Sequence, residues 1–358
     1  MRKRNVIVLL FVFSLFLIAS KGYPCTSFCL VDMQRPIVGK NYDWSIENGL
    51  AIVNKRGVQK TAAQYGAIEF GKPVKWKSKF GSITFNQFGR ELPMGGINEA
   101  GLVVEVLMLT ETVYPEPDSR PSISALQWVQ YQLDNFSTIQ EVIESNAHVR
   151  ILQTFSSPGL HYFVCDRDGN SAIIEFLNGG FIYYTDENMP VKVLTNSTYE
   201  QGIRSWNHQK HRKSNQYAGA RRFVHTGELL DKYGDGKPAD PVDYAFNVLA
   251  IVSQGSFTKW SIVYDIKNLA IYFRTYSNQK IRHIALQHFD FSCKSPVLVL
   301  NINNDLSGYV TDSFFEYTQE DNRLLVENIF RSISLNDMIR QEILGKAVTY
   351  PDENICVN

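Results

Sequence analysis

The sequence predicts an α+β protein in which two layers of strands pack face to face and helices cover them. Strand-like segments come first, and helices, strands, helices, strands and a last helix follow in that order. Two packed sheets between helices allow every amphipathic face to be buried. Aromatic residues, which favour strands and apolar pockets, make up 13% of the chain. Neither a repeat nor a linker interrupts the sequence, so we expect one domain over residues 25–358.

Residues 1–24 are expected to be a signal peptide. Arg2, Lys3 and Arg4 give this segment a basic start, and an apolar run interrupted only by Ser14 covers residues 6–19. Such a run is shorter than the roughly 20 residues that cross a bilayer, but it suits the apolar part of a leader. We therefore expect a secreted or periplasmic protein without membrane attachment once the leader is removed. An uncleaved N-terminal anchor is the alternative.

The first half of the mature chain contains strands followed by two helices. Residues 101–109 are apolar at nearly every position, as expected of a strand that is covered on both faces. In the first helix, Leu126, Val129 and Leu133 are spaced so that they lie on one side. The strands expected here are residues 25–32, 36–43, 50–56, 79–87 and 101–109, and the helices are residues 122–135 and 138–145.

The second half returns to strands, and two turns divide part of it into hairpins. Residues 166–170 (Asp-Arg-Asp-Gly-Asn) and residues 266–268 (Ile-Lys-Asn) each separate two strand-like segments. Asp240 is placed to cap a helix whose first turn contains Pro241. The strands expected here are residues 160–165, 171–177, 180–184, 191–195, 258–265 and 269–276, and the helices are residues 217–233, 240–253 and 322–344.

The charge balance argues against a nucleic-acid partner. The chain has 36 basic and 36 acidic residues, and residues 1–24 hold four of the basic residues and no acidic one. The remainder carries a net charge of about −4, which gives no electrostatic reason to bind nucleic acid or anionic lipid. The sequence also lacks a phosphate-binding loop and a convincing metal motif, so we expect neither a cofactor nor a metal.

The five cysteines form an odd set, which in an exported protein indicates a free thiol. Cys25 and Cys29 fall on one expected strand, where four residues span about 13 Å, so these two cannot pair with each other. Pairing among the other cysteines is left open by the sequence; these are Cys29, Cys165, Cys293 and Cys356.

Cys25, the first cysteine after the leader, is the candidate nucleophile. As an N-terminal residue it would supply a thiolate and an α-amine whose ordinary pKa is about 8. The amine can take the thiol proton and later give it to the leaving amine, so no histidine is needed. Asp43, at the end of the next strand, could hold that amine, and Lys40 could lower the pKa of the thiol. A structural or disulfide-bonded cysteine is the alternative interpretation.

Six short motifs follow one another along most of the mature chain. They are residues 25–28 (Cys-Thr-Ser-Phe), 39–44 (Gly-Lys-Asn-Tyr-Asp-Trp), 96–102 (Gly-Ile-Asn-Glu-Ala-Gly-Leu), 194–197 (Leu-Thr-Asn-Ser), 221–224 (Arg-Arg-Phe-Val) and 258–265 (Thr-Lys-Trp-Ser-Ile-Val-Tyr-Asp). This ordered series resembles the choloylglycine hydrolase and penicillin V acylase family of linear-amide C–N hydrolases.

The resemblance implies an αββα four-layer sandwich of the N-terminal-nucleophile hydrolases, built mainly from antiparallel sheets. By match to the motifs, Cys25 is the nucleophile and Asp43 is the carboxylate beside its amine. Asn196 is the side-chain donor to the oxyanion, and Arg222 is the cation near the nucleophile. Met108 occupies the position of the second oxyanion donor, where the family's hydrolases have Tyr or Asn, so here the backbone N–H would serve.

Two features leave the substrate and the processing open. The family's hydrolases usually have arginine where this chain has Lys40, and bile-salt specificity is less secure because the two side chains bind planar groups differently. Acid-ceramidase-like amidases share the Cys-Thr-Ser start, so a lipid amide is an alternative substrate. Ser20 and Gly22 favour leader cleavage after Gly22, which would leave Tyr23 and Pro24 ahead of the nucleophile.

The expected reaction is hydrolysis of a linear amide, through a thioester on Cys25, to an acyl acid and a small amine. The expected partner is a small-molecule amide with an apolar acyl group: a penicillin, bile salt, acyl-homoserine lactone or lipid amide. Hydrolysis of a lipid amide, or acyl transfer from it, is one alternative function. An exported non-catalytic binding protein with a disulfide-bonded Cys25 is another. The oligomeric state is left open, a homo-oligomer included.

Overall fold

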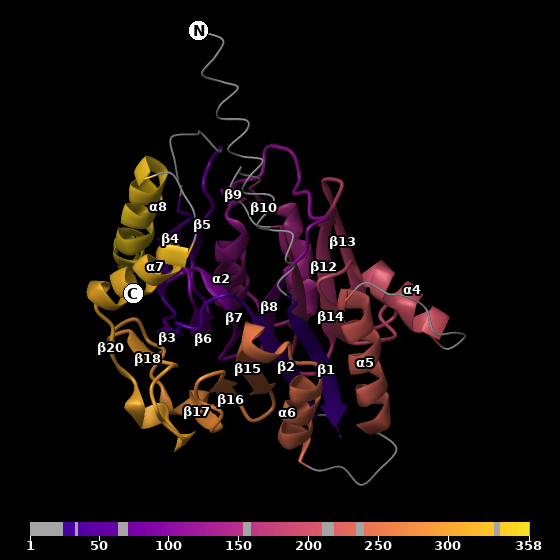
Figure 1. Ribbon diagram of the computed structural model, residues 1–358. Coiled ribbons are helices and arrows are strands. Elements are labelled where there is room, and N and C mark those ends of the chain that lie inside the picture. The colour runs from indigo at the N-terminus through magenta and orange to yellow at the C-terminus, as the bar shows by residue number, and fades with distance from the viewer. Residues whose placement is uncertain are drawn as a thin grey trace.

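Two large sheets form the centre of the computed structural model, and helices lie outside both of them (Figure 1). The structure describes residues 24–32, 35–63, 71–152, 159–209, 218–233, 240–332 and 337–357. The expected leader, apart from its last residue, lies outside the described residues. Within those ranges, no helix combines the length and the apolar character that a membrane crossing requires.

The first sheet has seven strands. In sheet order they are β14 (Val193–Thr195), β1 (Thr26–Asp32), β2 (Arg35–Asp43), β15 (Thr258–Asp265), β16 (Ala270–Thr275), β17 (Arg282–Ala285) and β19 (Gly308–Tyr309). All neighbours are antiparallel except β17 and β19. Thr26 of β1 faces Asn41 of β2 on one side and Thr195 of β14 on the other. The beginning of β1 therefore lies beside the ends of two other strands.

The second sheet has nine strands, and every neighbouring pair in it is antiparallel. In sheet order they are β13 (Gly180–Thr185), β12 (Ser171–Leu177), β11 (Leu160–Cys165), β8 (Val103–Met108), β7 (Pro93–Asn98), β6 (Ser82–Asn86), β3 (Leu50–Asn54), β18 (Leu298–Asn301) and β20 (Phe315–Glu316). β8 is buried at every position but its last, which confirms the strand predicted from its apolar sequence.

Helices cover the outer face of each sheet. Contacts to the first sheet come from α4 (Tyr199–Gln209), α5 (Ala218–Tyr233) and α6 (Pro241–Ile251), and contacts to the second come from α2 (Ala125–Asn135), which α3 (Ile139–Glu144) follows. The layer order is helix, sheet, sheet, helix, so the predicted αββα sandwich is confirmed. Asp240 caps α6, as predicted, by accepting a hydrogen bond from Val242 N at 2.9 Å.

Alternation along β2 decides which of its residues reach which layer. Lys40 faces the second sheet, where its Nζ lies 3.4 Å from Glu105 Oε2 of β8. Asn41 faces the helices, and its Nδ2 donates to Leu249 O of α6 at 2.8 Å. Lys40 and Asn41, which are consecutive in the motif of residues 39–44, therefore point to opposite faces of the sheet.

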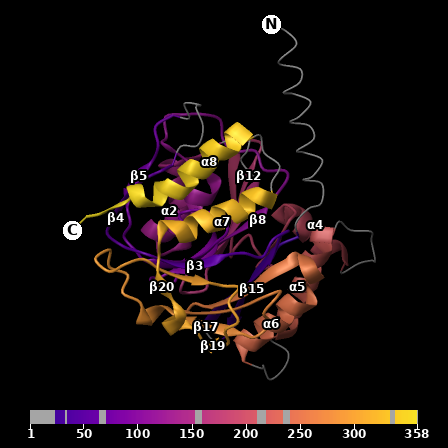
Figure 2. The ribbon, with the colours of Figure 1, turned by 60° about the vertical axis from the view of Figure 1, so that its left-hand side comes forward.

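The C-terminal region packs at one side of the molecule, where α7 (Gln319–Ser332) and α8 (Asp337–Thr349) lie against each other (Figure 2). The single helix predicted over residues 322–344 is therefore wrong. A disulfide joins Cys293 to Cys356, at the end of a small sheet made of β21 (Ile355–Cys356), β4 (Val58–Thr61) and β5 (Lys75–Lys77). The remaining short elements are β9 (Ser122–Ile123), β10 (Arg150–Ile151), η1 (Ser145–Ala147), η2 (Gly255–Phe257), η3 (Leu286–His288), η4 (Thr311–Ser313) and η5 (Tyr350–Glu353).

Several elements were not predicted, and β7 shows why. Its sequence, Pro-Met-Gly-Gly-Ile-Asn, combines residues that normally weaken a strand. The glycines are required because neighbouring strands come close: a Cβ on Gly96 would lie 2.5 Å from Ile83 O. The helix predicted from residue 122 begins later, since Ser122 and Ile123 form β9 and Ser124 caps α2. The helix α4 was missed because its sequence is largely polar.

Candidate active site

Cys25 immediately precedes β1, at the point where β14 and β2 end. Its side chain is 3% exposed, and Sγ donates to Asp43 O at 3.9 Å. Because both neighbours of β1 are antiparallel to it, their last residues return to its start. Asp43 ends β2 and Asn196 directly follows β14, so two of the predicted site residues lie beside Cys25.

Arg222 approaches the start of β1 from α5, on the outer side of the first sheet. Its Nη1 donates to Pro24 O at 2.9 Å, to Cys25 O, and to Thr26 Oγ1 at 2.9 Å. Its Nη2 donates to Asn196 Oδ1 at 3.2 Å. A guanidinium has five donors in a rigid plane, so it can bind several acceptors at once. Arg222 therefore fixes both the backbone around Cys25 and the orientation of the Asn196 amide.

The amide of Asn196 points from the end of β14 toward β8. Since Oδ1 binds Arg222, Nδ2 faces the other way and donates to Met108 O at 2.8 Å. The N–H of Met108 points to this same side: Leu109 N donates to Gly159 O, which makes Met108 a non-hydrogen-bonded position of the β8–β11 ladder. The side-chain donor and the backbone donor predicted for an oxyanion therefore lie along one edge of β8.

One oxygen of the Asp43 carboxylate is bound and the other is open. Thr258 Oγ1 donates to Oδ1, whereas Oδ2 is buried and has no hydrogen-bond partner in the described part of the chain. Burial raises the pKa of Asp43 to about 6, against the lowering effects of the Thr258 hydrogen bond, Arg222 and Lys40. A buried carboxylate oxygen without a donor is costly, so this position requires a donor that the described residues do not supply.

The Cys25 thiol is held in its neutral form. Burial raises its pKa, and the Asp43 carboxylate contributes to the rise. Lys40, the hydrogen bond to the Asp43 backbone and Arg222 act in the opposite direction without outweighing burial. A base must therefore remove the thiol proton before the sulfur can act as a nucleophile.

Lys40 belongs to a buried polar cluster between the sheets. Its Nζ donates to a backbone carbonyl of β8 and lies 3.4 Å from Glu105 Oε2, while Tyr264 OH donates to Glu105 Oε1 at 2.6 Å. The Glu105 carboxylate fills space beside Gly95, where a Cβ would lie 2.3 Å from it. Lys40 therefore affects Cys25 through its charge, while its hydrogen bonds go to β8.

Residues 25–240 match the sequence profile of the linear amide C–N hydrolases, choloylglycine hydrolase family. The chain belongs to this family. The resemblance predicted from the six motifs is thus confirmed, and the matched region begins at Cys25.

Relatives of known name support the same assignment. Penicillin V acylase from Pectobacterium atrosepticum is 31% identical over 222 residues, which are 56% of this chain and 57% of that protein, so the match spans little more than half of the relative. The structure of penicillin V acylase from Agrobacterium tumefaciens has a TM-score of 0.70 and 26% identity, and the match covers 82% of this chain and 98% of that one. A variant of conjugated bile acid hydrolase from Clostridium perfringens shares the fold, with a TM-score of 0.65, 20% identity and coverage of 79% and 98%.

Thr258 and Glu105 lie in this region, but the sequence did not single out either of them. Thr258 binds Asp43 only because the β2–β15 register puts the two residues opposite each other. Glu105 did carry a signal, since it is the one charged residue in the apolar segment 101–109. A charge in a strand buried on both faces needs a partner, and Lys40 is that partner.

The structure also decides between the interpretations of the cysteines. Cys25, Cys29 and Cys165 are free thiols, and the disulfide joins Cys293 and Cys356. The alternative of a disulfide-bonded, inert Cys25 is therefore wrong.

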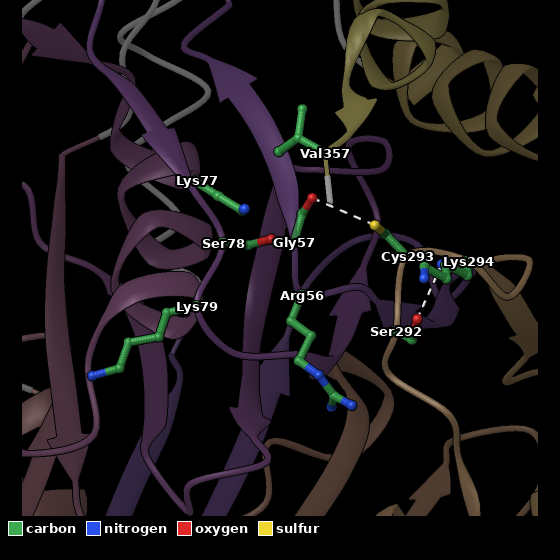
Figure 3. A pocket seen from close by; sticks show the side chains of 9 residues that line it. All are labelled: Arg56, Gly57, Lys77, Ser78, Lys79, Ser292, Cys293, Lys294 and Val357. Atoms are coloured by element: carbon green, nitrogen blue, oxygen red, sulfur yellow. Dashed lines mark hydrogen bonds between the residues drawn. The ribbon is translucent and has the colours of Figure 1, made fainter.

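A cavity of about 630 Å³ lies where the small sheet meets this disulfide (Figure 3). Several cations line it, but Lys79 and Arg56 extend in different directions, and Arg56 Nη1 is paired with Glu99 Oε2 at 2.6 Å. Neither Cys25 nor Asn196 is among its lining residues, so this cavity is separate from the candidate active site.

Proposed function

We propose that the chain hydrolyses the amide bond of a small molecule with an apolar acyl group, and that Cys25 is an N-terminal nucleophile. The products are an acyl acid and a small amine, and the intermediate is a thioester on Cys25 Sγ. Membership of the linear amide C–N hydrolases supports the reaction class. The named penicillin V acylases support a small-molecule amide as the substrate.

The open Oδ2 of Asp43 is the observation that carries the proposal. While Pro24 precedes Cys25, the nitrogen of Cys25 is an amide and has no basic lone pair. Cleavage before Cys25 creates an α-ammonium beside Asp43, which provides the missing donor and lowers the pKa of the carboxyl group. In its neutral form the same amine is the base that the thiol requires, and its ordinary pKa of about 8 suits that task.

The reaction then has two stages. The amine takes the proton of the Cys25 thiol, the thiolate attacks the amide carbonyl, and the protonated amine gives its proton to the leaving nitrogen. Water, activated by the same amine, hydrolyses the thioester and frees the acid. Both stages pass through a tetrahedral oxyanion.

Asn196 Nδ2 and the N–H of Met108 are the proposed donors to that oxyanion. Nδ2 donates to Met108 O in the absence of substrate, so a substrate oxygen would take the place of that acceptor. One such donor contributes about 3 kcal/mol to the stability of the transition state. Arg222 is a positioning residue in this mechanism, because its bond to Asn196 Oδ1 keeps the amide from turning over.

Export and removal of the leader are part of the proposal. The disulfide between Cys293 and Cys356 supports an oxidising compartment, where such bonds persist. The maturation step must remove Tyr23 and Pro24 if the leader is cut after Gly22. Arg222 already binds the carbonyl of Pro24, so the segment to be removed is held at the site.

N-terminal sequencing of the active, exported protein tests the mechanism most directly. We expect the mature chain to begin at Cys25 and turnover to appear only in that form. Full activity of a protein that still carries Tyr23 and Pro24 would exclude an α-amine base and overturn the proposal.

A lipid amide is the second candidate substrate, and the Cys-Thr-Ser start of the expected mature chain favours it, because this start also resembles that of acid-ceramidase-like amidases. A substrate panel separates the candidates: phenoxyacetyl, bile-acid, fatty-acyl and homoserine-lactone amides, each with and without an acceptor amine. Release of acid from the small amides alone supports the first candidate. Preference for the fatty-acyl amides, or formation of a new amide with the acceptor, supports the second.

A further inference from the structure

Two buried thiols outside the proposed mechanism face each other across the two sheets. Cys29 Sγ of β1 lies 3.5 Å from Cys165 Sγ of β11. The strands belong to different sheets, and their Cα atoms approach within 8 Å of each other. Both side chains are almost completely buried, and both are free thiols.

The two thiols differ in character. A hydrogen bond from Cys165 lowers the pKa of Cys29, and nearby Lys192 contributes in the same direction. Burial raises the pKa of Cys165 well above its usual range, and the neighbouring Cys29 sulfur adds to this rise. Cys29 is therefore the more acidic thiol of the pair. An attacking thiolate beside a second thiol is the arrangement in which thiol–disulfide exchange proceeds.

The other three cysteines do not compete with Cys29 and Cys165 as disulfide partners. Cys25 immediately precedes the strand that contains Cys29, four residues away, and its Sγ donates to Asp43 O instead. Cys293 and Cys356 are already bound to each other. That disulfide also indicates that the chain matures where disulfide donors are present.

We propose that Cys29 and Cys165 form a dithiol site that reacts with a disulfide oxidant to give a second disulfide, which joins the two sheets. Cys29 gives up its proton to solvent, and the resulting thiolate attacks one sulfur of the oxidant RSSR and expels the first RS⁻. Cys165 then loses its proton to that thiolate and attacks Cys29 Sγ, which expels the second RS⁻. The protein loses two protons and two electrons, and the oxidant is reduced to two thiols once the second thiolate is protonated.

The bond needs little movement and closes a long loop. The sulfurs have to approach from 3.5 Å to about 2.05 Å, the length of a disulfide bond. The two cysteines are 136 residues apart, so the bond restricts a large part of the unfolded chain. Since both thiols are buried, the oxidant reaches them while the chain folds.

Peptide mapping of protein folded with oxidised glutathione tests the proposal. Cys25→Ser is used as the background, so that any link from the N-terminal peptide must come from Cys29. We expect a linked pair of peptides containing Cys29 and Cys165, and no alkylation of either residue after denaturation without reductant. The thermal midpoint should rise by about 5 °C relative to protein folded without the oxidant.

Cys29→Ser/Cys165→Ser in the same background is the matched control. It should form only the Cys293–Cys356 disulfide, and its thermal midpoint should be the same whether or not the oxidant is present during folding. Alkylation of both Cys29 and Cys165 after folding with the oxidant would overturn the proposal. So would glutathione bound to either cysteine as the stable product, or a link from either one to Cys293 or Cys356.

Discussion

Two buried polar clusters of this protein differ in how completely their atoms are paired. Under the second sheet, Lys60 Nζ lies 2.6 Å from Glu91 Oε2 and 2.9 Å from Asp134 Oδ2. Trp76 Nε1 donates to the same carboxylate of Asp134 at 2.7 Å. No buried charged atom of Lys60, Glu91 or Asp134 lacks a hydrogen-bond partner.

In the cluster at the start of β1, some buried polar atoms lack a hydrogen-bond partner among the described residues. Asp43 Oδ2 and Arg222 Nε are buried without a hydrogen-bond partner among the described residues. A group of buried charges that satisfies itself stabilises a fold, whereas open donors and acceptors can bind something else. The pairing of atoms thus separates a structural cluster from a candidate catalytic one, although both are equally buried.

Replacing Cys25 should have the largest effect, and the distinction between the two clusters would fail if Cys25 were dispensable. Cys25→Ser should lower kcat/KM by at least about 10³-fold, because a hydroxyl is a far weaker nucleophile than a thiolate. The fold should survive, since within the described part of the chain Cys25 Sγ makes one weak hydrogen bond. Steady-state kinetics and a thermal melt measure the two effects, and unchanged turnover would remove Cys25 from the mechanism.

A structural role for the closed cluster predicts a loss of stability instead. Lys60→Met leaves two buried carboxylates without their cation and should lower the free energy of unfolding by about 3–5 kcal/mol. The kcat per folded molecule should stay unchanged. Urea unfolding and active-site titration measure these quantities, with Lys77→Met on the neighbouring exposed position as the control. A large fall in kcat with little change in stability would contradict the distinction.

The open cluster predicts the reverse pattern for Asn196. Asn196→Ala removes one oxyanion donor and should lower kcat by about 10²–10³-fold, with little change in KM. The substitution also leaves Arg222 Nη2 without its bond to Asn196, so the melting temperature serves as the check on the fold. A change confined to KM would mean that Asn196 only binds substrate.

Asp43 gives the smallest and most specific effect. In the chain that retains Pro24, burial raises the pKa of Asp43 from 3.8 to about 6, so folding favours the protonated form. The stabilisation is present below pH ~4 and is lost as the pH rises through about 6, and its full size is roughly 3 kcal/mol. Asp43→Asn should remove this pH dependence.

Unfolding of the unprocessed Cys25→Ser protein by urea between about pH 3 and about pH 8 measures this effect, because this range includes both pKa values. Asp43→Asn in the same background is the comparison. Mature protein should show a weaker dependence, because the new ammonium lowers the pKa of the carboxyl group. An identical pH dependence with and without Asp43 would contradict the assignment.

The sequence predicted the part of the site that follows from local geometry. A hairpin of β1 and β2 returns Asp43 to Cys25, and this could be inferred from two strands and a turn. Arg222 was preferred to Arg221 by its motif, and helix α5 indeed buries Arg222 and exposes its neighbour.

What the sequence did not predict depends on contacts between distant segments. The pairing of Lys40 with Glu105 requires the two sheets to be stacked in a particular register, which no local pattern contains. The Cys293–Cys356 disulfide likewise depends on where the C-terminal strand docks. The division into α7 and α8 was missed because the sequence between residues 332 and 337 contains no proline or glycine that would signal the end of a helix.

The space beside Gly95, which the Glu105 carboxylate fills, makes the residue at position 95 depend on the residue at position 105. The Glu105 carboxylate occupies the place that a Cβ on residue 95 would take, so position 95 can gain a side chain only if the carboxylate at position 105 moves or is lost. Among relatives, a side chain at the first position should therefore coincide with the absence of a carboxylate at the second. Relatives of that kind would have to neutralise the cation at the position of Lys40 in some other way.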